Sequence, residues 1–135
     1  NTPLRKRGKS PISKIQVELW ELCKQITRVR YGNTCYTCGK PHLEGAGWHT
    51  GHMIPKASLG AYLKYDLRLL RPQCYYCNIN LGGNGARFIE LMREREGNRY
   101  VNKILADEQI TVKALDHYII LVEQYKKLLK KATPL

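Results

Sequence analysis

Two Cys-x-x-Cys pairs constrain the fold of this chain more than any other feature of its sequence. They are Cys35–Cys38 and Cys74–Cys77. Two such pairs at this separation are typical of one structural zinc site with four thiolate ligands, which leave no coordination position for water. We therefore expect these four cysteines to bind one Zn²⁺. The site would fix both ends of the histidine-bearing segment that lies between the pairs.

The balance of charge narrows the class of partner. The chain has 135 residues and a formal net charge of +12. A positive field of this size favours a polyanion, and we expect nucleic acid rather than a membrane surface, because no apolar anchor or membrane span is evident. Residues 1–10 form a basic arm, which is interpreted either as a solvated tail or as a segment that contacts phosphates. The basic residues of the arm are Arg5, Lys6, Arg7 and Lys9.

The fifth cysteine, Cys23, has no partner of this spacing. An odd count with two Cys-x-x-Cys pairs fits a cytoplasmic zinc protein with a spare thiol better than a secreted disulfide scaffold. Cys23 falls on the apolar side of a predicted helix, so a buried core thiol is expected rather than a reactive one.

Residues 11–135 are expected to form one domain, in which helical regions flank a core at residues 33–96. A helix is predicted over residues 11–31, because Ser10 suits the N-cap, Pro11 the first turn, and Gly32 the stop. Residues 98–131 predict a short helix over 99–106 and a long one capped by Thr111, with His117 on its polar side. The predicted apolar stripe of the long helix is Leu115, Ile119, Val122, Tyr125 and Leu129.

The sequence of residues 33–96 predicts two short strands followed by helices. The first strand covers residues 47–55, and the second covers residues 67–70 and is ended by Pro72. A short helix follows Cys77, and another covers residues 86–96, so the fold class is α+β. Alternation along the first strand places His52 on one face and His49 on the other, unless a bulge at Gly51 changes the parity.

This order of elements, with zinc ligands before the first strand and before the helix, resembles the ββα-metal core of HNH (His-Me finger) nucleases. The stretch Gly51-His52-Met53-Ile54-Pro55 is similar to the early motif of that family, DHIIP, at every place except the Asp. The stretch Cys74-Tyr75-Tyr76-Cys77-Asn78 is similar to the late motif, CxxCN. The arrangement in which a zinc site joins the two ends of this core is similar to that of endonuclease VII.

The order of motifs also resembles the phage NinG (Rap) family of recombination nucleases. The shared pattern is a helix with Leu-Trp, then CxTCGK, HxGH and QCxxCN, and finally a Gly-Asn pair before a helical tail. Here the pieces are Leu19-Trp20, Cys35 to Lys40, His49 to His52, Gln73 to Asn78, and Gly83-Asn84. The resemblance covers most of the chain after the basic arm.

The resemblance implies a metal-dependent DNA endonuclease in the host cell of a phage or prophage, acting on branched recombination intermediates such as four-way junctions. Hydrolysis of a phosphodiester with one metal ion needs a base for the attacking water and a divalent cation on the scissile phosphate. By the resemblance, His52 is the base, and the amide oxygen of Asn78 is a ligand of Mg²⁺ or Mn²⁺.

Two departures from the HNH pattern leave parts of the site open. Many relatives carry a metal-binding Asp just before the base, where this chain has Gly51. His49 is kept as a catalytic residue and alternative ligand of the cation, although strand parity opposes it. The place of the middle Asn of the motif is taken by Leu69, for which Asp66 is a candidate substitute. Further candidates for phosphate contacts are Lys56, Arg68 and Arg71.

Other functions fit the same residues. A zinc-stabilised DNA-binding module could keep the fold without catalysis, and an RNA-directed protein would share the basic charge. A homodimer would suit symmetric cutting of a four-way junction, and the oligomeric state is left open. Tyr75 and Tyr76 lie within the second Cys-x-x-Cys segment, here called the second knuckle. They are interpreted as packing or surface residues of this knuckle rather than as surfaces on which bases stack.

Overall fold

The first helix, α1 (Pro11–Tyr31), begins and ends as the sequence predicts in the computed structural model, which describes residues 10–135. The Ser10 hydroxyl accepts a hydrogen bond of 3.1 Å from the amide of Ser13, and Gly32 ends the helix with a φ of 71°. Such caps act locally, which is why they can be recognised in the sequence. The face that α1 buries contains Cys23, which is fully buried as predicted.

The sheet has two antiparallel strands, β1 (His49–His52) and β2 (Leu70–Gln73), with His49 opposite Gln73 and His52 opposite Leu70. The second strand begins where the sequence predicted it to end, and Pro72 lies inside it, so that prediction is wrong. The Pro72 carbonyl accepts a bond of 2.8 Å from the amide of Tyr36, away from β1. The Pro72 nitrogen faces the same way, so the proline removes no bond between the strands.

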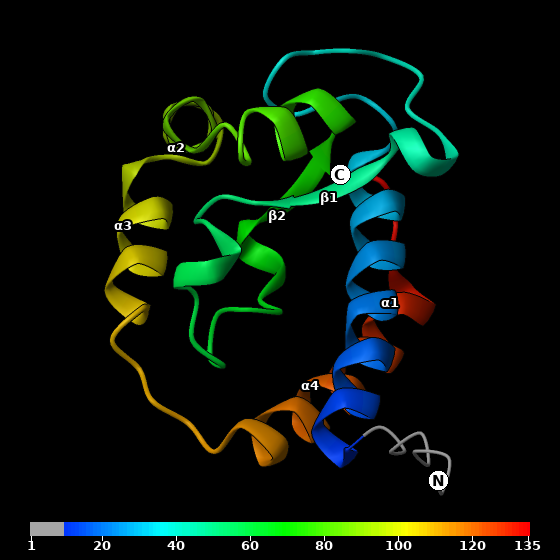
Figure 1. Ribbon diagram of the computed structural model, residues 1–135, viewed down its shortest axis with the longest axis vertical. Coiled ribbons are helices and arrows are strands. Elements are labelled where there is room, and N and C mark those ends of the chain that lie inside the picture. Colours follow the sequence, from blue (N-terminus) through cyan, green and yellow to red (C-terminus); the bar gives the residue numbers. More distant parts are fainter. Residues whose placement is uncertain (1–9) are drawn as a thin grey trace, which may run out of the picture.

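Helices surround the sheet on two sides. After β2 come a π-type turn (Tyr76–Asn80), α2 (Gly85–Glu96), α3 (Asn98–Asp107) and α4 (Ala114–Lys131). In Figure 1, the sheet lies between α2 and α3 on one side and α1 on the other, and α4 packs against α1. One apolar core joins all four helices to β2 and to Met53 and Ile54, which directly follow β1, and this confirms a mixed fold of helices and a small sheet.

The last helix buries Val122 and Tyr125 as predicted, but it differs from its prediction at its start and at Ile119. Thr111 does not cap it, because the helix begins at Ala114 after Lys113. Ile119 is 46% exposed, whereas Tyr118 is buried and packs edge-on against Tyr65 with ring centroids 5.2 Å apart. A tyrosine suits this face where the core offers its hydroxyl a hydrogen-bond partner, as it does for Tyr125. The Tyr125 hydroxyl donates to the carbonyl oxygen of Tyr65 at 2.7 Å.

His117 was expected on the solvated side of α4, but its ring stacks on Tyr62 with centroids 5.5 Å apart.

Across residues 10–135, no helix is both long enough and apolar enough to cross a membrane.

Candidate metal centre and adjacent cavity

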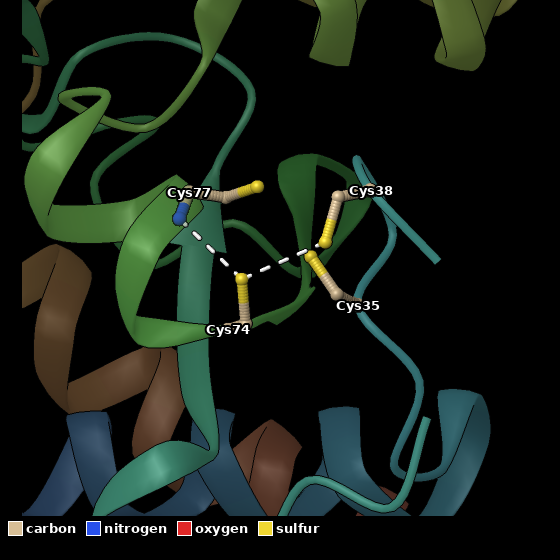
Figure 2. Close-up of side chains that lie close together, drawn as sticks. All are labelled: Cys35, Cys38, Cys74 and Cys77. Carbon is tan, nitrogen blue, oxygen red and sulfur yellow. Dashed lines mark hydrogen bonds between the residues drawn. The ribbon is translucent and has the colours of Figure 1, made fainter. Parts of the chain in front are cut away.

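The four cysteines of the two knuckles meet in space, as the sequence predicted. Their Sγ atoms all lie within 4.8 Å of one another, and those of Cys38 and Cys74 are 3.7 Å apart. Figure 2 shows the four side chains converging from the loop after α1 and from the end of β2. A zinc ion with four sulfurs at about 2.3 Å sets those sulfurs about 3.8 Å apart. The cluster therefore fits one tetrahedral zinc ion.

Hydrogen-bond donors surround the sulfurs, as expected for thiolates. The amide of Cys77 donates to Cys74 Sγ at 3.4 Å, and the Thr37 hydroxyl lies 3.5 Å from Cys35 Sγ. Burial alone would raise the pKa of Cys35, but the Thr37 hydroxyl and backbone amides lower it to about 6. Gly39, directly after the first pair, turns the chain with a φ of 78°. Both the donors and the geometry therefore suit a cation among these sulfurs.

An apolar cover shields this centre and ties it to α1. Leu43 and Trp48 are buried against three of the cysteines. The Trp48 indole donates a hydrogen bond of 3.0 Å to the carbonyl of Gly32, the residue that ends α1. The centre is thus fixed to the long helix as well as to the sheet.

A cavity of about 320 Å³ lies next to the zinc centre and contains the predicted catalytic residues. His52 from β1 and Asn78 from the π-type turn both line it, together with Lys56. A larger cavity of about 430 Å³, between α1, Trp48 and Leu129, holds none of the predicted site residues. The remaining residues of the first cavity are Trp20, Thr50, Ile54, Ile79, Gly82 and Gly83.

The His52 ring is held in one orientation and one tautomer. Its Nε2 lies 3.0 Å from the carbonyl oxygen of Lys64, so Nε2 carries the proton and Nδ1 carries the lone pair. The ring stacks on Trp20, with centroids 5.3 Å apart and planes 5° from parallel. Burial lowers the pKa of His52 to about 4, with smaller contributions in the same direction from the ammonium groups of Lys56 and Lys64. The imidazole is therefore neutral at pH 7.

His49 reaches Asn78, although β1 continues through Gly51 without a bulge. His49 Nε2 lies 2.9 Å from the carbonyl oxygen of Ala46, so Nε2 donates and Nδ1 must accept. Asn78 Nδ2 lies 2.9 Å from that Nδ1 and is the donor. His49 and His52 lie on opposite faces of the strand, as alternation predicted. His49 nevertheless contacts Asn78, because the π-type turn places Asn78 between His49 and the cavity.

The comparison with protein families agrees with the order of the motifs. Residues 3–134 match the family model described as "Bacteriophage Lambda NinG protein". The chain belongs to the NinG family. No curated protein and no solved structure gives a significant match.

In this NinG-family chain, the space beside Gly51 is filled by the side chain of Gln73. A Cβ at Gly51 would overlap the carboxamide of Gln73, which is fully buried. Gln73 Nε2 donates to the Thr37 hydroxyl at 3.0 Å and to the carbonyl of Gly83 at 2.9 Å. Sequence analysis gave Gln73 no role, although it stands directly before the second knuckle. The register pairs Gln73 with His49, and only the position of the Gln73 side chain in the structure shows that it excludes a side chain at residue 51.

The candidate phosphate contacts differ in how accessible they are. Lys56 lines the cavity. Arg68 forms ion pairs with Asp66 at 2.8 Å and with Asp107 at 3.0 Å. Arg71 is fully buried and stacks on Tyr31 at 4.1 Å, which argues against the expected contact with phosphate. The four basic residues of the arm lie outside the described residues.

The two residues linked to the middle Asn of the HNH pattern have structural contacts. Leu69 is fully buried in the core. The Asp66 carboxylate accepts from the amide of Arg68 at 2.9 Å and caps the turn Leu67–Leu69. Asp66 therefore stabilises the turn that leads into β2.

Proposed function

We propose that this NinG-family chain is a Mg²⁺- or Mn²⁺-dependent DNA endonuclease of the HNH type, acting on branched recombination intermediates inside a phage's host cell. One observation carries the proposal: His52 and Asn78 line the same cavity, beside a centre suited to structural zinc. The preference for branched DNA comes from the resemblance to phage recombination nucleases, among them endonuclease VII. The net charge of +12 supports a nucleic-acid substrate.

His52 has the features of a general base. Among the described residues, Nδ1 has no hydrogen-bond partner, so its lone pair is free to take a proton from the attacking water. The imidazolium that forms keeps its bond from Nε2 to the Lys64 carbonyl and lies over the Trp20 ring, which favours a cation. A bound phosphate would also raise the pKa of His52 from about 4 towards neutrality.

Asn78 and Thr50 supply oxygens that fit a hard divalent cation. The bond from Asn78 Nδ2 to His49 leaves Asn78 Oδ1 unpaired within residues 10–135. Thr50 lines the same cavity, and its buried hydroxyl also lacks a partner in that range. When bound, the cation would polarise the phosphoryl group and stabilise the leaving oxygen. We assign His49 the part of a positioning residue that fixes the amide of Asn78, rather than that of a ligand.

Cleavage assays on branched and linear DNA with Mg²⁺ or Mn²⁺ test the proposal. We expect nicking by the wild type and a rate about 10²–10⁴-fold lower for His52→Ala, the usual contribution of a general base. His42→Asn is the matched control, because His42 is exposed and has a φ of 57°, which Asn tolerates.

The competing function is a zinc-stabilised DNA-binding module without catalysis, which the absence of Asp at residue 51 favours. That function would be supported if the wild type bound branched DNA but nicked neither substrate with either metal. Equal cleavage by His52→Ala and the wild type would show that another group is the base. Competition with RNA of the same shape decides the class of nucleic acid.

A further inference from the structure

An exposed apolar surface, here called the apolar turn, surrounds the π-type turn after the second knuckle. The sequence predicted packing or surface roles for its two tyrosines, and the structure places both at the surface, as all the side chains of the turn are near or above half exposed. Surface aromatics gathered on one turn next to a cavity are a sign of an interaction site. The apolar turn consists of Tyr75 (55% exposed), Tyr76 (58%), Ile79 (51%) and Leu81 (44%).

The apolar turn is held in place by the zinc centre and adjoins the proposed active site. Cys77, one of the four cysteines, is buried within the turn, and the amide of Leu81 donates to the carbonyl of Tyr76 at 2.9 Å. Ile79 also lines the cavity that contains His52. The ring of Tyr75 lies edge-to-face with that of His49, with centroids 5.5 Å apart. A ligand on this surface would therefore continue into the cavity.

The charge around the apolar turn indicates what the ligand is. The adjoining cavity is lined by Lys56 and by no carboxylate, and the chain as a whole has a formal net charge of +12. A partner must therefore offer apolar flat groups together with negative charge. Unpaired nucleotides do so, because their bases stack on aromatic rings while their phosphates contact basic groups.

We propose that the apolar turn binds unpaired bases of a nucleic-acid strand, with the rings of Tyr75 and Tyr76 as stacking surfaces. The direction of that strand, towards the cavity with His52 and Asn78, rests on the proposed nuclease function. The binding itself does not, because stacking needs neither the base nor the divalent cation. Paired DNA, whose bases are stacked on one another, would gain little from this surface.

Fluorescence anisotropy without Mg²⁺ or Mn²⁺ tests this binding on two DNAs of equal length, one single-stranded and one fully paired. We expect the double variant Tyr75→Ala/Tyr76→Ala to bind the single strand about tenfold or more weakly, and the paired duplex within about twofold of the wild type. The matched control, Tyr75→Phe/Tyr76→Phe, keeps both rings and should bind both DNAs like the wild type.

A second measurement compares the wild type with the double Ala variant, and its wild-type result does not depend on the folding of the variant. 2-Aminopurine in an unpaired segment should be quenched on binding, as it is when stacked, and should not be quenched in the double Ala variant. Loss of affinity for both DNAs alike, or unquenched 2-aminopurine with the wild type, would overturn the proposal. So would a change in sedimentation mass in the Ala variant, which would mark the apolar turn as a contact between copies. Failure of cleavage alone would leave the binding result intact.

Discussion

At the scale of single residues, the site depends on rings whose protons have fixed positions. A backbone carbonyl accepts from Nε2 of both His52 and His49, which leaves Nδ1 as the acceptor in each ring. In His52 that nitrogen is free for water, whereas in His49 it holds the amide of Asn78. The two histidines of the HxGH motif therefore share one tautomer. They differ in the partner of Nδ1, which is open to water in His52 and bonded to Asn78 in His49.

The burial of His52 predicts a dependence of stability on pH. Its pKa is lowered to about 4 in the folded chain, against 6.5 as its ordinary value. Between these values the unfolded chain binds more protons, so stability falls as the pH drops from 6.5 towards 4. At pH 5 the loss should be roughly 2 kcal/mol. Urea unfolding at pH 8 and at pH 5 measures it, because the contribution of His52 is fully present only above pH 6.5.

His52→Phe is the control for this dependence, because it keeps a ring on Trp20 and cannot bind a proton. Release of zinc by acid affects both proteins, so the difference between their pH slopes isolates His52. If the two slopes are equal, His52 does not have a lowered pKa in the folded chain.

The contact between His49 and Asn78 predicts a change in metal affinity. In His49→Phe the Asn78 amide loses its acceptor and can rotate, so Mn²⁺ should bind about 10–100-fold more weakly. Electron paramagnetic resonance of free Mn²⁺ measures the affinity without any cleavage. In an Asn78→Ala background the same His49 substitution should have no further effect. A full effect there would mean that His49 is itself a ligand.

At the scale of elements, the predictions succeeded where the determinants are local. Both ends of α1 follow from Ser10 and Gly32, which act within one turn of the chain. The limits of the strands depended on tertiary pairing instead, since Pro72 fits β2 only because its carbonyl bonds to Tyr36. The buried face of α4 depended on Tyr65, a partner in another element.

The same limit applies to the site. The spacing of the cysteines predicted the zinc centre, because four thiolates in two knuckles have few other arrangements. The contact of His49 with Asn78 and the filling of the space at Gly51 were missed. The first depends on where the π-type turn packs against the sheet, and the second on the path of the Gln73 side chain across it, and a single sequence specifies neither.

The sheet predicts a coupling between Gly51 and Gln73. A methyl group at residue 51 would overlap the buried carboxamide, so Gly51→Ala should cost about 1–3 kcal/mol of stability, as for other overpacked sites. Gln73→Ala removes the obstacle but also the bonds to Thr37 and Gly83. The double variant should therefore lose less stability than the sum of the two single variants, which urea unfolding can measure. Strict additivity would contradict the overlap.

At the scale of the whole molecule, the zinc centre is joined both to the core and to the proposed active site. Trp48 connects it to the end of α1. The Thr37 hydroxyl contacts Cys35 and accepts from Gln73, which in turn donates to Gly83 in the wall of the cavity. Metal binding and the shape of the cavity are thus parts of one network of contacts. In a chain with one small core, the metal is expected to carry much of the stability.

Removal of zinc should therefore unfold the chain and not only empty the centre. Elemental analysis should give about one zinc ion per chain, the number for one four-thiolate site. Chelation, or Cys38→Ser, should lower the melting temperature by more than about 20 °C, because structural zinc contributes a large share of folding energy. Cys23→Ala is the matched control: it also deletes a thiol, but one that donates to the Tyr65 carbonyl and lies outside the centre, so it should keep the full zinc content. A Cys38→Ser protein with full zinc and unchanged melting would show that the cysteines do not form the site that stabilises the fold.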